Sequence, residues 1–170
     1  HGANTALNVL YSGTVSAATE GMMMGIRSLA VSLTSFDYSA DMLGAARCAA
    51  VVAKSLPTLP LPKDTLLNLN VPAIPPELLK GIRTVRLAAS MWEDAYEKRT
   101  DPQGHEYYWI KGVYKTLDAT LETDDGALAE GYAALTPIRY DLTDRETLSV
   151  LLDLNWNDGN ESTSVDVVFG

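Results

Sequence analysis

The segment Asn4–Gly21, NTALNVLYSGTVSAATEG, decides the predicted fold, because it places a turn of small residues directly before a helix. The turn is Ser12-Gly13-Thr14, and apolar residues follow it at helical spacing until Gly25, which is placed to end the helix. The first N–H groups of a helix lack intrahelical acceptors and carry partial positive charge, so this turn suits a phosphate group. An ordinary N-cap is the other interpretation of Ser-Gly-Thr here, and local sequence leaves both open.

Strand and helix patterns alternate after this first helix. Apolar residues that alternate with small polar ones predict strands over residues 29–33 and 67–71, and an apolar stripe predicts a helix over 41–55. Strand, helix and strand at this spacing imply parallel pairing through a helical crossover. Further strands are predicted over 81–89 and 133–138, so the chain is assigned to the α/β class.

The second half of the chain predicts a long β-hairpin arm over residues 90–113. Asp101-Pro102-Gln103-Gly104 suits a type I turn, and the flanking strands carry Trp92 and the run Tyr107-Tyr108-Trp109. A small core does not need such an arm, so we expect it to contact a neighbouring subunit or to cover a site. Thr143 and Glu146 form a capping box that predicts a C-terminal helix.

Composition restricts the partners of the chain. Its 170 residues include 13 basic and 22 acidic side chains, a net charge of −9 that argues against nucleic acid or an anionic membrane as main partner. A small anionic substrate needs only a local group of donors and stays compatible with this charge. The single cysteine, Cys48, excludes an intramolecular disulfide framework, and no apolar run reaches transmembrane length. We therefore expect a cytoplasmic protein.

Several residues allow both a functional and a structural interpretation. Asn68 and Asn70 could reach a site from the end of their strand, but edge hydrogen bonds before Pro72 are the interpretation that we favour. His105 follows the hairpin turn, where an exposed histidine is more typical than a general base. Cys48 is most simply a small core residue. The aromatic side chains of the arm could stack on a base, but packing against a subunit is the preferred hypothesis.

A series of motifs resembles the SurE survival-protein family. GAN at residues 2–4 and YSGTVSAATEG at 11–21 are followed by blocks in the order of that family. These blocks are RSLAVSL at 27–33, LLNLNVP at 66–72, GIRTVR at 81–86, DPQGHEYYWI at 101–110 and TDDGALAEGYAALTPIRYDLT at 123–143. Several motifs in order are more specific than any one of them, and they cover the chain from His1 to about Thr143.

The resemblance implies a three-layer, Rossmann-like α/β sandwich, of which residues 1–157 would form the C-terminal portion. The hairpin arm and the C-terminal helix would protrude from it, and residues 158–170 would be a flexible tail. In this family an aspartate pair, a serine and an asparagine hold the divalent metal, Mg²⁺ or Mn²⁺. The resemblance implies that none of them lies in this chain and that the asparagine would fall immediately before His1, so we assign no metal ligand.

The phosphate side of the family's site does fall within the chain. The resemblance implies phosphate binding by Asn4, Ser12, Gly13 and Thr14, with Asn4 and Ser12 as catalytic residues. His1 would lie beside the expected metal asparagine. Thr123-Asp124-Asp125-Gly126 looks like the missing metal motif, but no apolar strand precedes it, so we interpret Asp124 as a helix cap.

The function implied by the resemblance is that of a divalent-metal-dependent phosphatase. It would hydrolyse nucleoside monophosphates, as a 5′- or 3′-nucleotidase, with polyphosphate as a further substrate. It would assemble as a homodimer or homotetramer through the arm and the C-terminal helix. Without the metal ligands we expect the chain as given to be inactive. The alternative is a non-catalytic α/β fragment that binds phosphate or assembles through its arm.

Overall fold

The computed structural model describes residues 2–118, 120–154 and 156, with the side chains of Trp92 and Asp94 left aside. It divides the chain into two compact units, His1–Tyr140 and Asp141–Gly170. His1 and residues 158–170, for which the sequence predicts a site neighbour and a flexible tail, lie outside the described residues. No described helix has the length and apolar character needed to cross a membrane.

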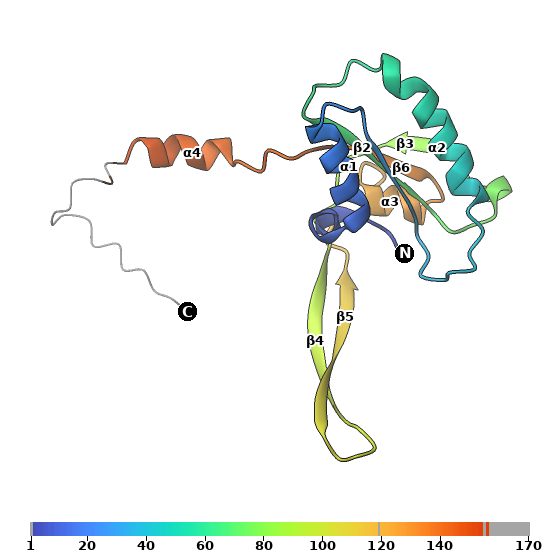
Figure 1. Cartoon of the computed structure of the whole chain (residues 1–170), viewed down its shortest axis with the longest axis vertical. Helices are drawn as coiled ribbons and strands as arrows, with labels where there is room; N and C mark the ends of the chain where they lie inside the picture. The colour runs from blue at the N-terminus through green and yellow to red at the C-terminus, as the bar shows by residue number, and fades with distance from the viewer. Residues whose placement is uncertain (1, 119, 155, 157–170) are drawn as a thin grey trace. The chain divides into compact units, whose positions relative to one another are not determined.

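A four-stranded sheet forms the centre of the first unit (Figure 1). Its order is β1 (Leu29–Leu33), β2 (Thr65–Val71), β6 (Ala133–Arg139) and β3 (Ile82–Thr84). β1 and β2 are parallel, with the helix α2 (Leu43–Ser55) between them in the chain, which confirms the predicted crossover. β6 runs antiparallel to β2 and parallel to β3.

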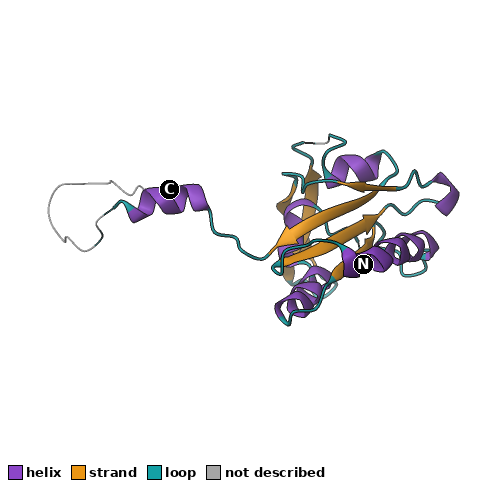
Figure 2. Ribbon diagram, turned by 90° about the horizontal axis from the view of Figure 1, so that it is seen from above, coloured by secondary structure: helices purple, strands orange, loops and turns teal. Residues whose placement is uncertain are grey.

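Helices cover both faces of this sheet and make three layers (Figure 2). Leu67, Leu69 and Val71 of β2 pack in one core cluster with the apolar side of α2, and Cys48 is buried there as predicted. Leu66 lies in a second cluster with residues of α1 (Gly13–Met23). The short helix α3 (Asp124–Ala129) packs against β6. Side chains of a strand alternate between faces, so Asn68 and Asn70 share the face of Leu66.

The first unit differs from the sequence predictions in two places. A single strand was expected over 81–89, but β3 ends at Thr84, and beyond it only an isolated bridge joins Arg86 to Thr123. The turn of small residues predicted at Ser12-Gly13-Thr14 is itself preceded by a 3₁₀ helix, η1 (Ala6–Tyr11), which the sequence analysis did not predict. Two further 3₁₀ turns, η2 (Leu56–Thr58) and η3 (Pro76–Leu78), lie around proline residues. The predicted end of α1 is confirmed, since Gly25 has φ +81° directly after it.

The hairpin arm consists of β4 (Met91–Thr100) and β5 (Glu106–Lys115), paired antiparallel along their whole length. The two strands run together away from the sheet (Figure 1). The predicted turn closes them, because the Gly104 N–H donates to the Asp101 carbonyl at 3.0 Å. The Asp101 carboxylate also accepts from the N–H groups of Gln103 and His105. The arm predicted over 90–113 is therefore confirmed.

In the second unit, the described residues contain one helix, α4 (Arg145–Leu152). Its N-cap is Asp144, whose carboxylate accepts from the N–H groups of Glu146 and Thr147 at 3.0 and 3.2 Å. The predicted capping box began one residue earlier, at Thr143. A carboxylate accepts two N–H bonds and favours the positive end of the helix dipole more strongly than a hydroxyl, which explains the difference.

Candidate phosphate site

Asn4 is held by three polar side chains at the carboxyl ends of the two parallel strands. Its N–H donates to Asn70 Oδ1 at 2.8 Å, and its carbonyl accepts from Asn68 Nδ2 at 2.8 Å and Asn70 Nδ2 at 3.0 Å. Its own side-chain Nδ2 donates to Ser32 Oγ at 2.5 Å. Asn68 and Asn70 are fully buried, and these bonds satisfy both polar groups of the Asn70 amide and the Nδ2 of Asn68, whereas Asn68 Oδ1 has no hydrogen-bond partner among the described residues.

A cavity of about 160 Å³ lies beside Asn4. It is lined by Gly2, Asn4, Thr14, Val31, Ser32, Leu33, Ser35, Asp37 and Met42. Asn4 and Thr14, two of the four residues assigned to phosphate from the sequence, thus share one cavity. Ligands of open α/β sheets bind outside the carboxyl ends of the strands, which is where this cavity lies.

The other two assigned residues form the start of α1. Ser12 is its N-cap: the buried hydroxyl accepts from the Val15 N–H at 3.1 Å, so this oxygen serves the helix itself. Gly13 is exposed, and no atom of the chain outside the helix lies within 4 Å of the position that a Cβ would occupy. The N-terminal end of an 11-residue helix therefore stands open beside Thr14.

The described residues do not provide a metal site. None of their histidine, cysteine, aspartate and glutamate side chains form a group of three or more that could hold an ion. Asp37 is the one carboxylate among the residues that line the cavity. Hydrogen bonds from the backbone N–H and hydroxyl of Ser39 lower the pKa of Asp37, so it is ionised, and no second carboxylate joins it among the residues that line this cavity.

The motif Thr123-Asp124-Asp125-Gly126 is structural at each of its positions. Thr123 is the N-cap of α3, so the predicted cap at Asp124 is wrong by one residue. Asp124 is fully buried and accepts three backbone N–H bonds, while Asp125 accepts from the Tyr114 hydroxyl at 2.6 Å. A Cβ at Gly126 would lie 1.9 Å from the carbonyl oxygen of Thr120.

The structure agrees with one of the remaining sequence predictions and contradicts another. His105 is exposed on the hairpin turn, 3.1 Å from the Asp101 carboxylate, as predicted. The favoured interpretation of Asn68 and Asn70 as edge hydrogen bonds is wrong, because both reach inward to Asn4. Sequence reasoning also missed Ser32. The one available signal was the position of two asparagines on the same face of an otherwise apolar strand.

Comparison with known proteins identifies the family. The sequence model of the protein family described as "Survival protein SurE" matches residues 1–94, which is more than half of the chain. A "5'-nucleotidase SurE" of Nitratidesulfovibrio vulgaris (strain DP4) is 44% identical over 90% of this chain and 61% of its own length. The protein of that name from Christiangramia forsetii is 37% identical over 93% of this chain and 61% of its own length.

A solved structure agrees with these sequence relatives. The SurE protein from Aquifex aeolicus superposes with a TM-score of 0.71 at 34% identity, covering 89% of this chain and 62% of that protein. The chain thus spans about three-fifths of the length of the relatives it matches. Both the matched segment, which includes the Asn4 and α1 region, and the shared Rossmann-like architecture lead to one conclusion: the chain belongs to the SurE family.

Proposed function

We propose that this chain forms the phosphate-binding side of a site that hydrolyses nucleoside monophosphates. The observation that carries the proposal is the placement of Asn4. Three side chains from two parallel strands fix it beside a cavity that Thr14 also lines, next to the open start of α1. Relatives named 5'-nucleotidase support a phosphate ester as the ligand.

The contacts would be made by groups that donate hydrogen bonds to phosphate oxygens. The exposed N–H groups of Gly13 and Thr14 and the Thr14 hydroxyl would do so from α1, aided by the helix dipole. Asn4, which lines the same cavity as Thr14, would add its side-chain amide. Ser12 would act by capping the helix and orienting these donors. Since all these contacts are to phosphate, polyphosphate is proposed as a further substrate.

We also propose that hydrolysis depends on a divalent metal ion, although the described residues include no group of metal ligands. Among the described residues no three histidine, cysteine, aspartate or glutamate side chains form a group that could hold an ion, so we propose that Mg²⁺ or Mn²⁺ is held by residues other than these. The chain as given should then release no phosphate from AMP with either ion above a chelated control.

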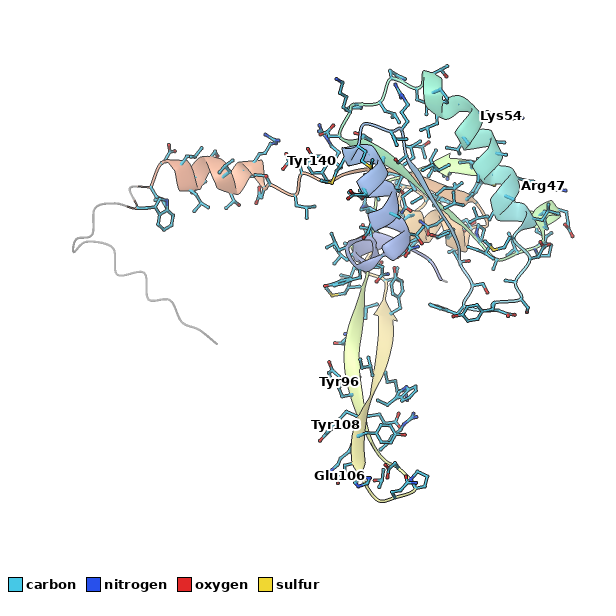
Figure 3. The ribbon with its side chains drawn as sticks, viewed as in Figure 1. Arg47, Lys54, Tyr96, Glu106, Tyr108 and Tyr140 are labelled. Atoms are coloured by element: carbon cyan, nitrogen blue, oxygen red, sulfur yellow. The ribbon has the colours of Figure 1, made fainter. Side chains whose placement is uncertain are left out.

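Assembly through the hairpin is proposed on the exposure of its side chains. Tyr96, Tyr108 and Ile110 are each 65% exposed, although they are large and apolar or aromatic. Figure 3 labels Tyr96 and Tyr108 on the hairpin. Tyr96 lies opposite Ile110 in the ladder, and Tyr108 is two residues away on the same face. A two-stranded hairpin is marginally stable alone, so a second copy of the chain is the proposed partner.

The proposed function is tested by mapping ligand contacts with amide NMR on the purified chain. AMP and inorganic phosphate should both shift the signals of Asn4, Gly13 and Thr14, whereas adenosine should not. Shifts of the same residues with adenosine would indicate a nucleoside site instead. If phosphate and AMP shift none of these residues, the proposed site is wrong.

A further inference from the structure

The buried carboxylate of Asp124 joins three segments that are far apart in the sequence. Its Oδ2 accepts from the Ala6 N–H at 2.9 Å, across 118 residues. Its Oδ1 accepts from the Ala88 N–H at 2.8 Å and from the Asp125 N–H at 2.9 Å. One side chain therefore connects the segment that follows Asn4, the segment that precedes β4, and the first turn of α3.

Ala6 needs such a contact, because its backbone conformation is unfavourable. Its φ is +49°, and it is the one non-glycine residue with positive φ among those described. L-residues with a Cβ rarely adopt this left-handed conformation, and it persists where the surrounding structure imposes it. Ala6 is fully buried, and the bond from its N–H to Asp124 is the contact that fixes the peptide plane at this point.

The same turn of α3 also contacts the base of the hairpin. Asp125 accepts from the hydroxyl of Tyr114 on β5. Burial and the bond to Asp125 raise the pKa of Tyr114 to about 12, so the phenol keeps its proton at neutral pH and remains a donor. The start of α3 is itself anchored, since the Asp124 N–H donates to the Arg86 carbonyl at 3.0 Å. The hairpin and the Asn4 segment are therefore attached to one short, fixed turn.

We propose that Asp124 is a positioning residue for the phosphate site, which holds the Asn4–Ala6 segment in place and ties it to the base of the hairpin. This inference rests on the proposed function. Asp124 touches no substrate: it acts through the Ala6 backbone, two residues from Asn4. Loss of its carboxylate would release the left-handed conformation at Ala6 and displace Asn4 from the cavity that it shares with Thr14.

The test compares Asp124→Asn with Asp118→Asn. Asp118 offers a matched control, because its carboxylate accepts from the Ala89 N–H at 2.7 Å, beside Ala88, and pairs with Arg86 rather than with the Asn4 segment. Asp124→Asn replaces one acceptor by a donor that faces an N–H group. We expect it to weaken binding of inorganic phosphate roughly tenfold, while Asp118→Asn binds like the unchanged chain.

A rescue variant separates positioning from general destabilisation. Ala6→Gly should restore most of the phosphate affinity in the Asp124→Asn background, because glycine adopts positive φ without help. Recovery of the unfolding temperature without recovery of affinity would make Asp124 merely structural and overturn the proposal. So would equal affinity in the unchanged, Asp124→Asn and Asp118→Asn chains.

A measurement on the unchanged chain keeps the proposal testable if the Asp124→Asn chain does not fold. The Ala6 amide should exchange with solvent as slowly as the Ala88 amide, since both donate to the same buried carboxylate. Exchange of Ala6 at the rate of an exposed amide overturns the proposal. If the unchanged chain binds no phosphate while Ala6 is protected, the proposed function fails and the contact that carries the positioning role stands.

Discussion

At the scale of single residues, burial separates the residues that we propose to contact phosphate from the residues that hold them in place. Asn68, Asn70 and Asp124 are fully buried and bonded to backbone groups, so their polar atoms hold the segment around Asn4. Gly13 and Thr14 are exposed, so their donors are free to meet a ligand. Leaving a buried amide unpaired costs about 1–3 kcal/mol, which makes the supporting group intolerant of apolar substitution.

Gly126 illustrates how strongly one supporting residue is constrained. We expect Gly126→Ala to lower the free energy of unfolding by about 1–3 kcal/mol, because the new methyl would lie 1.9 Å from the Thr120 carbonyl oxygen. Gly44→Ala is the matched control: it also lies in a helix, and its Cβ would be 3.9 Å from Pro76 Cγ. The control should be neutral or stabilising by up to about 1 kcal/mol in urea denaturation. Equal effects of both changes would contradict this assignment.

Tyr114 gives the chain a specific response to alkaline pH. Its pKa is raised to about 12 in the folded chain, so the fold binds the phenolic proton more tightly than the unfolded state does. The resulting stabilisation is complete below a pH of about 10 and is lost as the pH rises toward 12. The stability advantage of the unchanged chain over Tyr114→Phe should therefore shrink between pH 10 and 12. An advantage that does not change over this range would show that the phenol titrates normally.

At the scale of elements, hydrophobic alternation predicted the strands whose two faces meet different neighbours. The strands at 29–33 and 67–71 and the helix between them follow directly from that pattern. The hydrophobic pattern did not predict the backbone conformation at positions where a long-range contact determines it. The turn at Ala6 that begins η1 depends on Asp124, and the end of β3 depends on the hydrogen bond from the Arg86 N–H to the Glu122 carbonyl. No local sequence signal encodes either partner.

In the candidate site too, local features could be predicted from the sequence and long-range contacts could not. Ser12-Gly13-Thr14 could be placed at the start of a helix from the sequence, because capping is a local interaction. Asn4 could be assigned through the family resemblance alone. Its three partners, Ser32, Asn68 and Asn70, could not be found in advance, because they meet it only through the order of the strands.

The proposed role of the hairpin, pairing of two copies of the chain, can be tested by measuring their association. If copies of the chain pair through the face that carries Tyr96, Tyr108 and Ile110, then Ile110→Asp should lower the molar mass measured by light scattering toward that of a monomer. Val113 is on the opposite face of the same strand and is 57% exposed, so Val113→Asp is the matched control and should leave the mass unchanged. Equal masses for the unchanged chain and both variants would exclude this face as the interface.

At the scale of the whole molecule, the chain spans about three-fifths of the length of its SurE relatives. The residues proposed to bind phosphate lie within its described part, where no group of three or more potential metal ligands is found. If the proposed function is correct, phosphate binding does not require the metal ion, and it should be measurable on this chain in the absence of any metal ion.

The most direct test of this central claim is the affinity of the chain for inorganic phosphate, measured by calorimetry for three proteins. Gly13→Val places a branched side chain at the start of α1, where no atom outside the helix lies within 4 Å of the Cβ position, so the fold should be retained. Ala17→Val adds similar bulk one turn along the same exposed helix face. We expect Gly13→Val to weaken phosphate binding at least roughly tenfold, and Ala17→Val to bind like the unchanged chain. Equal affinity in all three folded proteins would contradict the assignment of phosphate to this site.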